Sequence, residues 1–254
     1  MFIDTHCHLT DKYVSDTGVD AVLARAHAAG VDTIICPTAD AADIPAALNL
    51  AETHDNIFCT IGIHPEYAPI DPDVHLTDAI LSHPRVIGVG EIGLDYHMGA
   101  QTRDAQIKLF ERQIALARRH NLPVAIHTRD AEDDTAAILS ASGAFGVMHC
   151  YTGSWNLAKK MLDLGFYFSA SGILTFKNAD AVRETFAKIP TDRIVIETDA
   201  PYCAPVPYRG KQCEPFMVVE TAKVLAAVKG MDIDTLAPIL TQNTARLYPK
   251  ITLK

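Results

Sequence analysis

The feature that most constrains the fold is a regular alternation of strand-like and helix-like segments along all 254 residues. The apolar, strand-like runs are residues 2–8, 32–36, 57–62, 86–91, 123–127, 145–149, 166–169 and 194–199. Segments with helical spacing are 19–29, 41–53, 73–82, 101–120, 132–141, 155–164, 178–188, 216–228 and 233–248. This alternation over about 250 residues is typical of an α/β protein with a (β/α)8 TIM barrel. An open, doubly wound sheet has the same alternation and is the alternative.

Potential metal ligands close five of the strand-like runs. They are His6, His8, Glu91, His127, His149 and Asp199. His6 and His8 are two residues apart, so on a strand they face the same side. Ligands from runs so far apart in the sequence converge only if the sheet closes into a ring, where all strand ends meet at one rim. We therefore expect a single-domain barrel over residues 1–254 with its site at the C-terminal rim of the strands.

The ligand types indicate the chemistry of this site. Four imidazoles and two carboxylates predict two divalent metal ions, which we expect to be zinc, manganese or magnesium. Imidazole with carboxylate suits zinc, manganese or iron(II), whereas magnesium prefers oxygen ligands alone. The alternative to metal binding is a structural histidine that is bonded to a backbone carbonyl. This could explain one histidine at a strand end, but it is a poor explanation for four histidines and two carboxylates at such positions. The pattern predicts a metal-dependent hydrolase.

Composition limits the partners and the location. The net charge of −9 argues against a broad basic surface that holds nucleic acid, although bound divalent ions could still capture DNA transiently. No secretory signal pattern and no apolar run of ~18 residues is present, so we expect a cytoplasmic chain with no membrane contact. The six cysteines lack C-x-x-C spacing, so we expect reduced thiols. Cys203 and Cys213 lie in a loop near the site, and metal ligation there is the less favoured alternative.

The motifs around these residues resemble those of the TatD-type metal-dependent deoxyribonucleases of the amidohydrolase-like superfamily. The resemblance spans essentially the whole chain, in order. Its segments are Asp4-Thr5-His6-Cys7-His8, Gly62-Ile63-His64-Pro65-Glu66, Gly90-Glu91-Ile92-Gly93-Leu94-Asp95-Tyr96, His127-Thr128-Arg129, His149-Cys150-Tyr151-Thr152-Gly153, Glu197-Thr198-Asp199-Ala200-Pro201-Tyr202, Arg209-Gly210-Lys211 and Asn243-Thr244. Cys213, Tyr151-Thr152 and Ala200 depart from the commonest family pattern without touching a proposed ligand, and they bear on substrate preference.

The resemblance implies how the ligands divide. His6, His8 and Asp199 would hold one ion, His127 and His149 the other, and Glu91 would bridge them. A bound divalent ion can lower the pKa of water to roughly 7, so we expect a metal-bridged hydroxide to attack a phosphodiester. Asp199 and Glu91 are the predicted catalytic residues, with Asp199 orienting the water and accepting its proton. The predicted activity is a 3′–5′ exonuclease on DNA, with no obligate protein partner.

Further residues are predicted to bind substrate. They are His64, Arg129, Arg209 and Lys211 for phosphate, and Tyr96 and Tyr151 for a base. Each has an alternative: a loop cap for His64, a rim salt bridge for Arg129, a solvated charge pair for Arg209 and Lys211, and plain packing for the tyrosines. Asp4 and Glu197 precede ligands by two residues, so we expect them to support those ligands from the same face.

Two other functions fit the same ligand set. The first is an amidohydrolase-like enzyme acting on carboxylic, lactone or other small esters or amides, since barrels host many chemistries. The second is a metal-binding partner protein without catalysis. The predicted phosphate-binding residues favour the nuclease, because a neutral amide or lactone does not need them.

Overall fold

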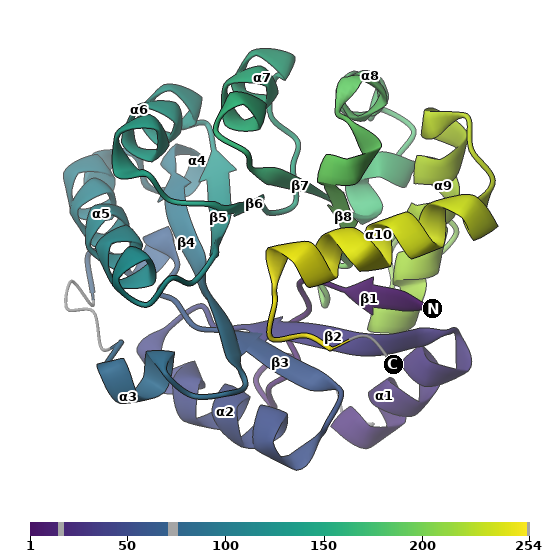
Figure 1. Cartoon of the computed structure of the whole chain (residues 1–254), viewed down its shortest axis with the longest axis horizontal. Coiled ribbons are helices and arrows are strands. Elements are labelled where there is room, and N and C mark those ends of the chain that lie inside the picture. Colours follow the sequence, from purple (N-terminus) through teal and green to yellow (C-terminus); the bar gives the residue numbers. More distant parts are fainter. Residues whose placement is uncertain (15–17, 71–75, 253–254) are drawn as a thin grey trace.

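The computed structural model describes residues 1–14, 18–70 and 76–252, and within these ranges eight parallel strands follow one another around a barrel (Figure 1). The strands are β1 (Phe2–Asp4), β2 (Val31–Pro37), β3 (Ile57–Thr60), β4 (Val86–Asp95), β5 (Val124–Arg129), β6 (Gly146–Met148), β7 (Tyr167–Ala170) and β8 (Ile194–Ile196). The ring is closed just beyond β1 and β8. There Thr5 N–H donates to the carbonyl of Ile196 at 3.0 Å, and Asp199 N–H donates to the carbonyl of His6 at 2.9 Å. The predicted TIM barrel is confirmed.

Helices flank the strands, most of them on the outside of the barrel (Figure 1). They are α1 (Val19–Ala28), α2 (Ile44–Thr53), α3 (Asp78–Leu81), α4 (Tyr96–Gly99), α5 (Arg103–Arg119), α6 (Glu132–Ser142), α7 (Trp155–Asp163), α8 (Asp180–Lys188), α9 (Val218–Lys229) and α10 (Ile233–Leu247). Short 3₁₀ turns are η1 (Ala41–Asp43), η2 (Pro65–Tyr67), η3 (Ala100–Thr102), η4 (Gly172–Thr175), η5 (Thr191–Arg193) and η6 (Pro215–Met217). Among the described residues, no helix is both long and apolar enough to cross a membrane.

A layer of apolar side chains fills the inside of the barrel. Seven of the strands contribute one buried residue each to it: Ile3, Ile35, Ile87, Ala125, Val147, Tyr167 and Val195. Their neighbours in sequence, such as Ile34 and Ile126, belong instead to the large core between strands and helices. This division follows from the strand period of two, which sends successive side chains to opposite faces.

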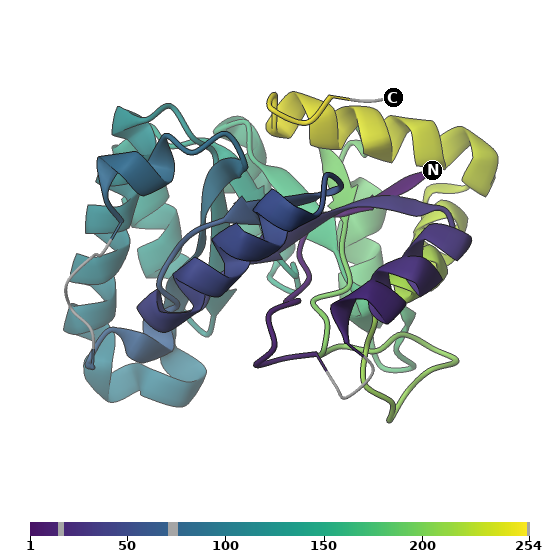
Figure 2. The ribbon, with the colours of Figure 1, turned by 90° about the horizontal axis from the view of Figure 1, so that it is seen from below.

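The last helix closes one end of this barrel. Figures 1 and 2 show α10 lying across the end where β1 begins, close to both termini. Leu247, Tyr248 and Ile251, which end and follow α10, pack onto the interior layer. Because this end is sealed by apolar packing, the opposite rim, at the C-terminal ends of the strands, is the end left for a polar site.

Several predicted boundaries were wrong at the strand ends. Strands β1, β6 and β8 stop short of the predicted ligands, whereas β4 runs four residues past Glu91. The backbone bends sharply after β6 and β8, with φ of 41° at Cys150 and 58° at Asp199, and such left-handed conformations do not continue a strand. The predicted helix 73–82 is observed only as α3, and its first three residues lie outside the described part of the chain.

Candidate metal centre

The ligand positions continue the inward-facing rows of the barrel. His127 lies two residues beyond Ala125 on β5, and His149 lies two residues beyond Val147 of β6. Because residues two apart share a face of a strand, both imidazoles stand directly above the apolar layer. Gly93 of β4 has φ of 146°, and a Cβ there would collide with the backbone carbonyl of His127. The close approach of β4 and β5 at this point therefore requires glycine.

The carboxylate of Glu91 lies at the middle of the cluster, and the side chain is 7% exposed. Its Oε2 is 3.5 Å from His6 Nε2 and 3.8 Å from His8 Nε2. Its Oε1 is 2.9 Å from His127 Nδ1, 3.2 Å from His149 Nε2 and 3.6 Å from His64 Nε2. The two oxygens thus face different sets of imidazoles, as a carboxylate shared by two cations must.

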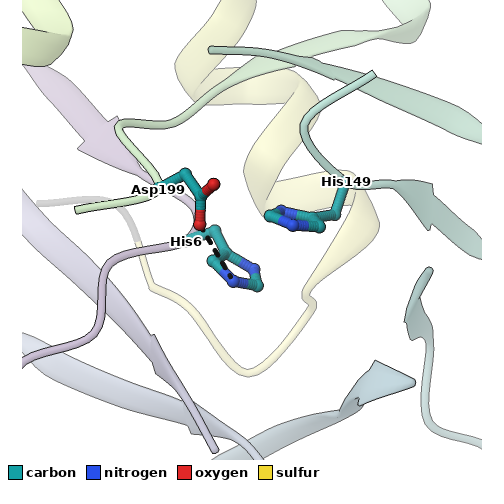
Figure 3. A group of neighbouring side chains, drawn as sticks. All are labelled: His6, His149 and Asp199. Carbon is teal, nitrogen blue, oxygen red and sulfur yellow. Dashed lines mark ion pairs between the residues drawn. The ribbon is translucent and has the colours of Figure 1, made fainter. Parts of the chain in front are cut away.

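Asp199 approaches the same cluster from the segment after β8. Its Oδ1 is 3.9 Å from His6 Nε2, and the rings of His6 and His149 stack with centroids 3.8 Å apart (Figure 3). Three groups of donors have their ligand atoms within 4.8 Å of one another: His6 with His8 and Glu91, His6 with His149 and Asp199, and His64 with Glu91 and His127. The structure therefore brings all six predicted ligands together.

Each of two inner histidines carries a second carboxylate on its outer nitrogen. Nε2 of His127 is 3.1 Å from Asp95 Oδ2, and Nδ1 of His149 makes a close contact of 2.8 Å with Glu197 Oε1. Metal-binding histidines commonly have such a carboxylate on the nitrogen that does not face the ion, which fixes the ring and raises its basicity. Glu197 thus lies where the sequence predicted, on the ligand face.

Asp4 supports the site through the backbone. Its carboxylate accepts hydrogen bonds from Thr198 N–H at 2.9 Å, from the Thr198 hydroxyl at 2.6 Å and from His6 N–H at 3.3 Å. These bonds tie the segment after β8, which carries Asp199, to the segment after β1, which carries His6. Asp4 therefore holds two ligand-bearing segments in register across the closure of the barrel.

The donor set fits divalent ions on two grounds. Two ligands held about 2.0–2.1 Å from one zinc at the tetrahedral angle lie roughly 3.3 Å apart, and the imidazole–carboxylate contacts here span 2.9 to 3.9 Å. In addition, the buried Nε2 of His6 has no hydrogen-bond partner among the described residues, although it faces two carboxylates. A buried polar atom without a partner is costly, and a cation between the nitrogen and the carboxylates would satisfy it.

Burial and neighbouring charges shift the pKa values of the carboxylate and the imidazoles in the cluster. Burial alone would raise the pKa of Glu91, but the neighbouring His149, His64 and His127 bring it well below its usual value. Burial lowers the pKa of His127, yet hydrogen bonds to Asp95 and Glu91 outweigh this and raise it to about 9. His8 is affected in the opposite way, since burial and the adjacent His6 lower its pKa to about 3. Glu91 is thus an anion at neutral pH, and His8 has a free lone pair.

The cluster opens into a cavity of about 630 Å³ at the rim. Glu91, Asp95, His127, His149 and Asp199 lie along its lining together with His8 and His64. The outer lining includes Tyr13, Glu66, Arg129, Thr152, Ile173 and Tyr202. Tyr202 is 55% exposed, so an aromatic face is available to a bound molecule at the mouth of the cavity.

Two of the residues predicted to bind substrate lie on this cavity. His64 begins η2, where its Nδ1 accepts a hydrogen bond from Glu66 N–H at 3.3 Å, and its Nε2 faces Glu91. His64 therefore caps the loop and also faces the cluster, while phosphate binding by His64 stays a prediction. Arg129 ends β5 on the cavity lining, is exposed, and forms no ion pair within the described part of the chain. The rim salt bridge considered for Arg129 is not observed.

The other four predicted substrate residues do not line the cavity, so neither tyrosine lies where the predicted contact with a nucleotide places it. The Tyr96 hydroxyl donates to Asp134 Oδ2 at 2.6 Å. Tyr151 is 2% exposed, donates to the carbonyl of Ser154 and packs against Phe168. The observed contacts of both tyrosines therefore agree with the alternative, that they pack against neighbouring residues. Arg209 lies 3.7 Å from the ring centre of Phe176 and donates to the carbonyl of Ala204, and Lys211 is also exposed.

Sequence reasoning missed some residues of the site. Asp95 was not singled out, although it lies four residues after Glu91 on β4 and an even spacing places both on one face. His64 was predicted to bind phosphate, whereas its Nε2 also lies among the potential metal ligands. Tyr13 and Tyr202 follow the ligand segments at positions where no periodic pattern indicates their direction.

Comparison with known proteins identifies the family of this chain. A family model described as TatD related DNase matches residues 3–249. YabD of Bacillus subtilis (strain 168), described as an uncharacterized metal-dependent hydrolase, is 40% identical over 253 residues that cover 98% of this chain and 99% of that protein. YcfH of Escherichia coli (strain K12), with the same description, is 40% identical over 254 residues that cover 97% of this chain and 95% of that protein.

A solved structure extends the comparison to three dimensions. The crystal structure of YjjV, a TatD homologue from Escherichia coli K12, superimposes with a TM-score of 0.86 at 30% identity and covers 98% of each chain. Matched over nearly its whole length in sequence and in fold, this chain belongs to the TatD family of metal-dependent hydrolases.

Proposed function

We propose that this hydrolase is a deoxyribonuclease that cleaves phosphodiester bonds from the 3′-end of DNA with two divalent ions. The observation that carries the proposal is the position of Arg129, an exposed cation without an ion pair in the described structure, on the same cavity as the metal ligands. A guanidinium can donate two parallel hydrogen bonds to a phosphate, whereas a neutral lactone or amide offers it no anion. The matching family description, TatD related DNase, supports the same activity.

The residues present favour zinc or manganese over magnesium, because imidazoles dominate the ligand set. Glu91 would lie between the two ions, with His6, His8 and Asp199 on one side and His127 and His149 on the other. When bound, such ions activate a water molecule and stabilise charge on the attacking and leaving oxygens of a phosphate. Glu91 remains anionic and so balances part of the positive charge of the site.

The chain supplies the proton transfer and the orientation. Burial raises the pKa of Asp199, although its neighbours His149 and His6 oppose the shift. Asp199 also lines the cavity beside His6, so a carboxylate oxygen would be placed to take the proton of the attacking water. Arg129 would hold the phosphate against the metal centre, and Tyr202 would offer its exposed ring to a base at the mouth of the cavity.

The test is cleavage of a 5′-labelled single-stranded oligodeoxynucleotide by protein stripped with EDTA and then given Mg²⁺, Mn²⁺ or Zn²⁺. We expect a ladder that shortens from the 3′-end with added metal, no ladder from His127→Ala, and an unchanged ladder from His97→Ala. His97 is the matched control because it is an exposed histidine paired with Asp130, outside the cluster. Absence of cleavage with every metal, together with turnover of simple carboxylic esters, would reject the nuclease and support the amidohydrolase-like alternative.

A further inference from the structure

A second group of potential metal ligands lies beside the centre and contains sulfur. Cys150 directly follows His149, and Cys203 lies four residues after Asp199 in the loop beyond β8. The sulfur atoms of both cysteines and a carboxylate oxygen of Asp199 all lie within 4.8 Å of one another. Both thiols are free and partly exposed. Cys150 and Cys203 are far apart in the sequence and form no Cys-x-x-Cys motif. They lie close together because the barrel closes.

We propose that Cys150, Cys203 and Asp199 form a further site, which shares Asp199 with the centre, for a thiophilic divalent ion such as Zn²⁺. Thiolate ligands select zinc over harder ions such as manganese and magnesium. Three protein ligands with one position left for water or another molecule are a common arrangement for zinc. The site differs from the imidazole-rich centre in its donors, so the two should differ in the metals that they accept.

Asp199 connects this site with the centre. Its Oδ1 is 3.9 Å from His6 Nε2, while its Oδ2 accepts a hydrogen bond from the Cys203 thiol at 3.6 Å. The two oxygens of one carboxylate therefore face the two sites. Cys150 and Asp199 both line the cavity, which gives an ion a path from solvent.

The binding step needs no oxidant or reductant. Before binding, the Cys203 thiol donates to Asp199 and the Cys150 thiol donates to the Ser171 hydroxyl at 3.1 Å. An entering Zn²⁺ replaces the two S–H protons, which pass to solvent, and forms two metal–sulfur bonds. These weak thiol hydrogen bonds are exchanged for stronger metal–ligand bonds, and binding releases up to two protons.

The test uses Co²⁺ as a spectroscopic substitute for Zn²⁺ in the full-length protein, kept reduced with a phosphine. A cobalt–thiolate bond gives a charge-transfer band in the near ultraviolet, which imidazole and carboxylate ligands do not give. We expect the band in the wild type, its loss in Cys150→Ala and Cys203→Ala, and its retention in Cys213→Ala. Cys213 is the matched control, since it lies in the same loop as Cys203 but outside the group.

A second measurement needs no variant. Alkylation of each thiol is followed by mass spectrometry with and without Zn²⁺, and we expect the ion to protect Cys150 and Cys203 at least tenfold more than Mn²⁺ does. Absence of the cobalt band in the wild type, its persistence in both variants, or equal alkylation with and without Zn²⁺ would overturn the site. Because neither readout depends on turnover, a protein that shows the band but cleaves no DNA would keep this site and lose only the proposed nuclease function.

Discussion

Oδ2 of Asp95 lies 3.1 Å from Nε2 of His127, while the other ring nitrogen of that histidine faces Glu91 at 2.9 Å. Glu197, just past β8, and His149, just past β6, repeat the relationship, with Glu91 again on the inner nitrogen. Each of the two histidines thus lies between Glu91, which both contact, and an outer carboxylate that the other histidine does not contact. This arrangement orients the rings and makes them stronger donors to a metal.

Removing either outer charge should weaken metal binding. We expect Asp95→Asn and Glu197→Gln each to lower the affinity for Mn²⁺ by about 10- to 100-fold, since a neutral amide orients the ring but polarises it less. Isothermal titration of the stripped proteins measures this. Asp130→Asn, which alters only an exposed pair with His97, is the control and should bind as the wild type does. Wild-type affinity in both variants would contradict the supporting role.

Metal binding should strengthen as the pH rises. In the metal-free protein, hydrogen bonds to Asp95 and Glu91 raise the pKa of His127 to about 9 although burial opposes this, so at neutral pH this ring carries a proton that a metal must displace. Affinity should therefore increase up to about pH 9, by at most about tenfold per pH unit for each proton released. Titration in buffers of different ionisation enthalpy counts the protons. Affinity that is constant between pH 6 and pH 9 would rule out the competition.

The two arginines predicted to bind phosphate should behave differently. Arg129 lines the cavity and Arg209 does not, since it packs on Phe176. We expect Arg129→Ala to lower kcat/KM for an oligodeoxynucleotide by about 10- to 100-fold, the equivalent of a lost charge-assisted hydrogen bond of about 1.5–3 kcal/mol. Arg209→Ala should change it less than about twofold. Steady-state kinetics measure both effects. Equal effects of the two substitutions would disprove the assignment of phosphate binding to Arg129 alone.

The closure of the barrel should depend on Asp4. Asp4→Ala leaves the buried Thr198 N–H without its partner, so the free energy of unfolding should fall by about 1–3 kcal/mol. Thr198→Val, which removes the hydroxyl bond to Asp4 and the acceptor of Ala200 N–H but keeps Thr198 N–H bound to Asp4, should cost about 1 kcal/mol. Urea denaturation of the metal-free proteins measures both, with the exposed Thr53→Val as control. A stability of Asp4→Ala equal to the wild type would show that these bonds do not hold the closure.

The barrel and its principal ligands could be predicted because both depend on local patterns. Apolar runs alternate with helical spacing, and the six ligands lie within or just past five of the strands that these runs form. Glu197 could be predicted for the same reason, as a position two residues before a ligand. The strand ends were less predictable, since sharp bends at Cys150 and Asp199 stop β6 and β8 early.

Side-chain direction beyond the strands could not be predicted. Tyr96 and Tyr151 both follow strands, but the segments that contain them direct one hydroxyl to Asp134 and the other to the carbonyl of Ser154. The group of Cys150, Cys203 and Asp199 depends on contact between segments after β6 and β8, and no spacing in the sequence encodes it. Contacts of this kind depend on how the closed barrel places segments that are far apart in the sequence.

If Glu91 joins two divalent ions, the number of ions bound per chain must fall when its charge is removed, and this number can be measured. Mn²⁺ is the right probe because it disfavours the thiol site. We expect two Mn²⁺ per wild-type chain by equilibrium dialysis and elemental analysis, two in the rim control Glu66→Gln, and at most one, weakly held, in Glu91→Gln. Two tightly bound Mn²⁺ in Glu91→Gln would contradict the account.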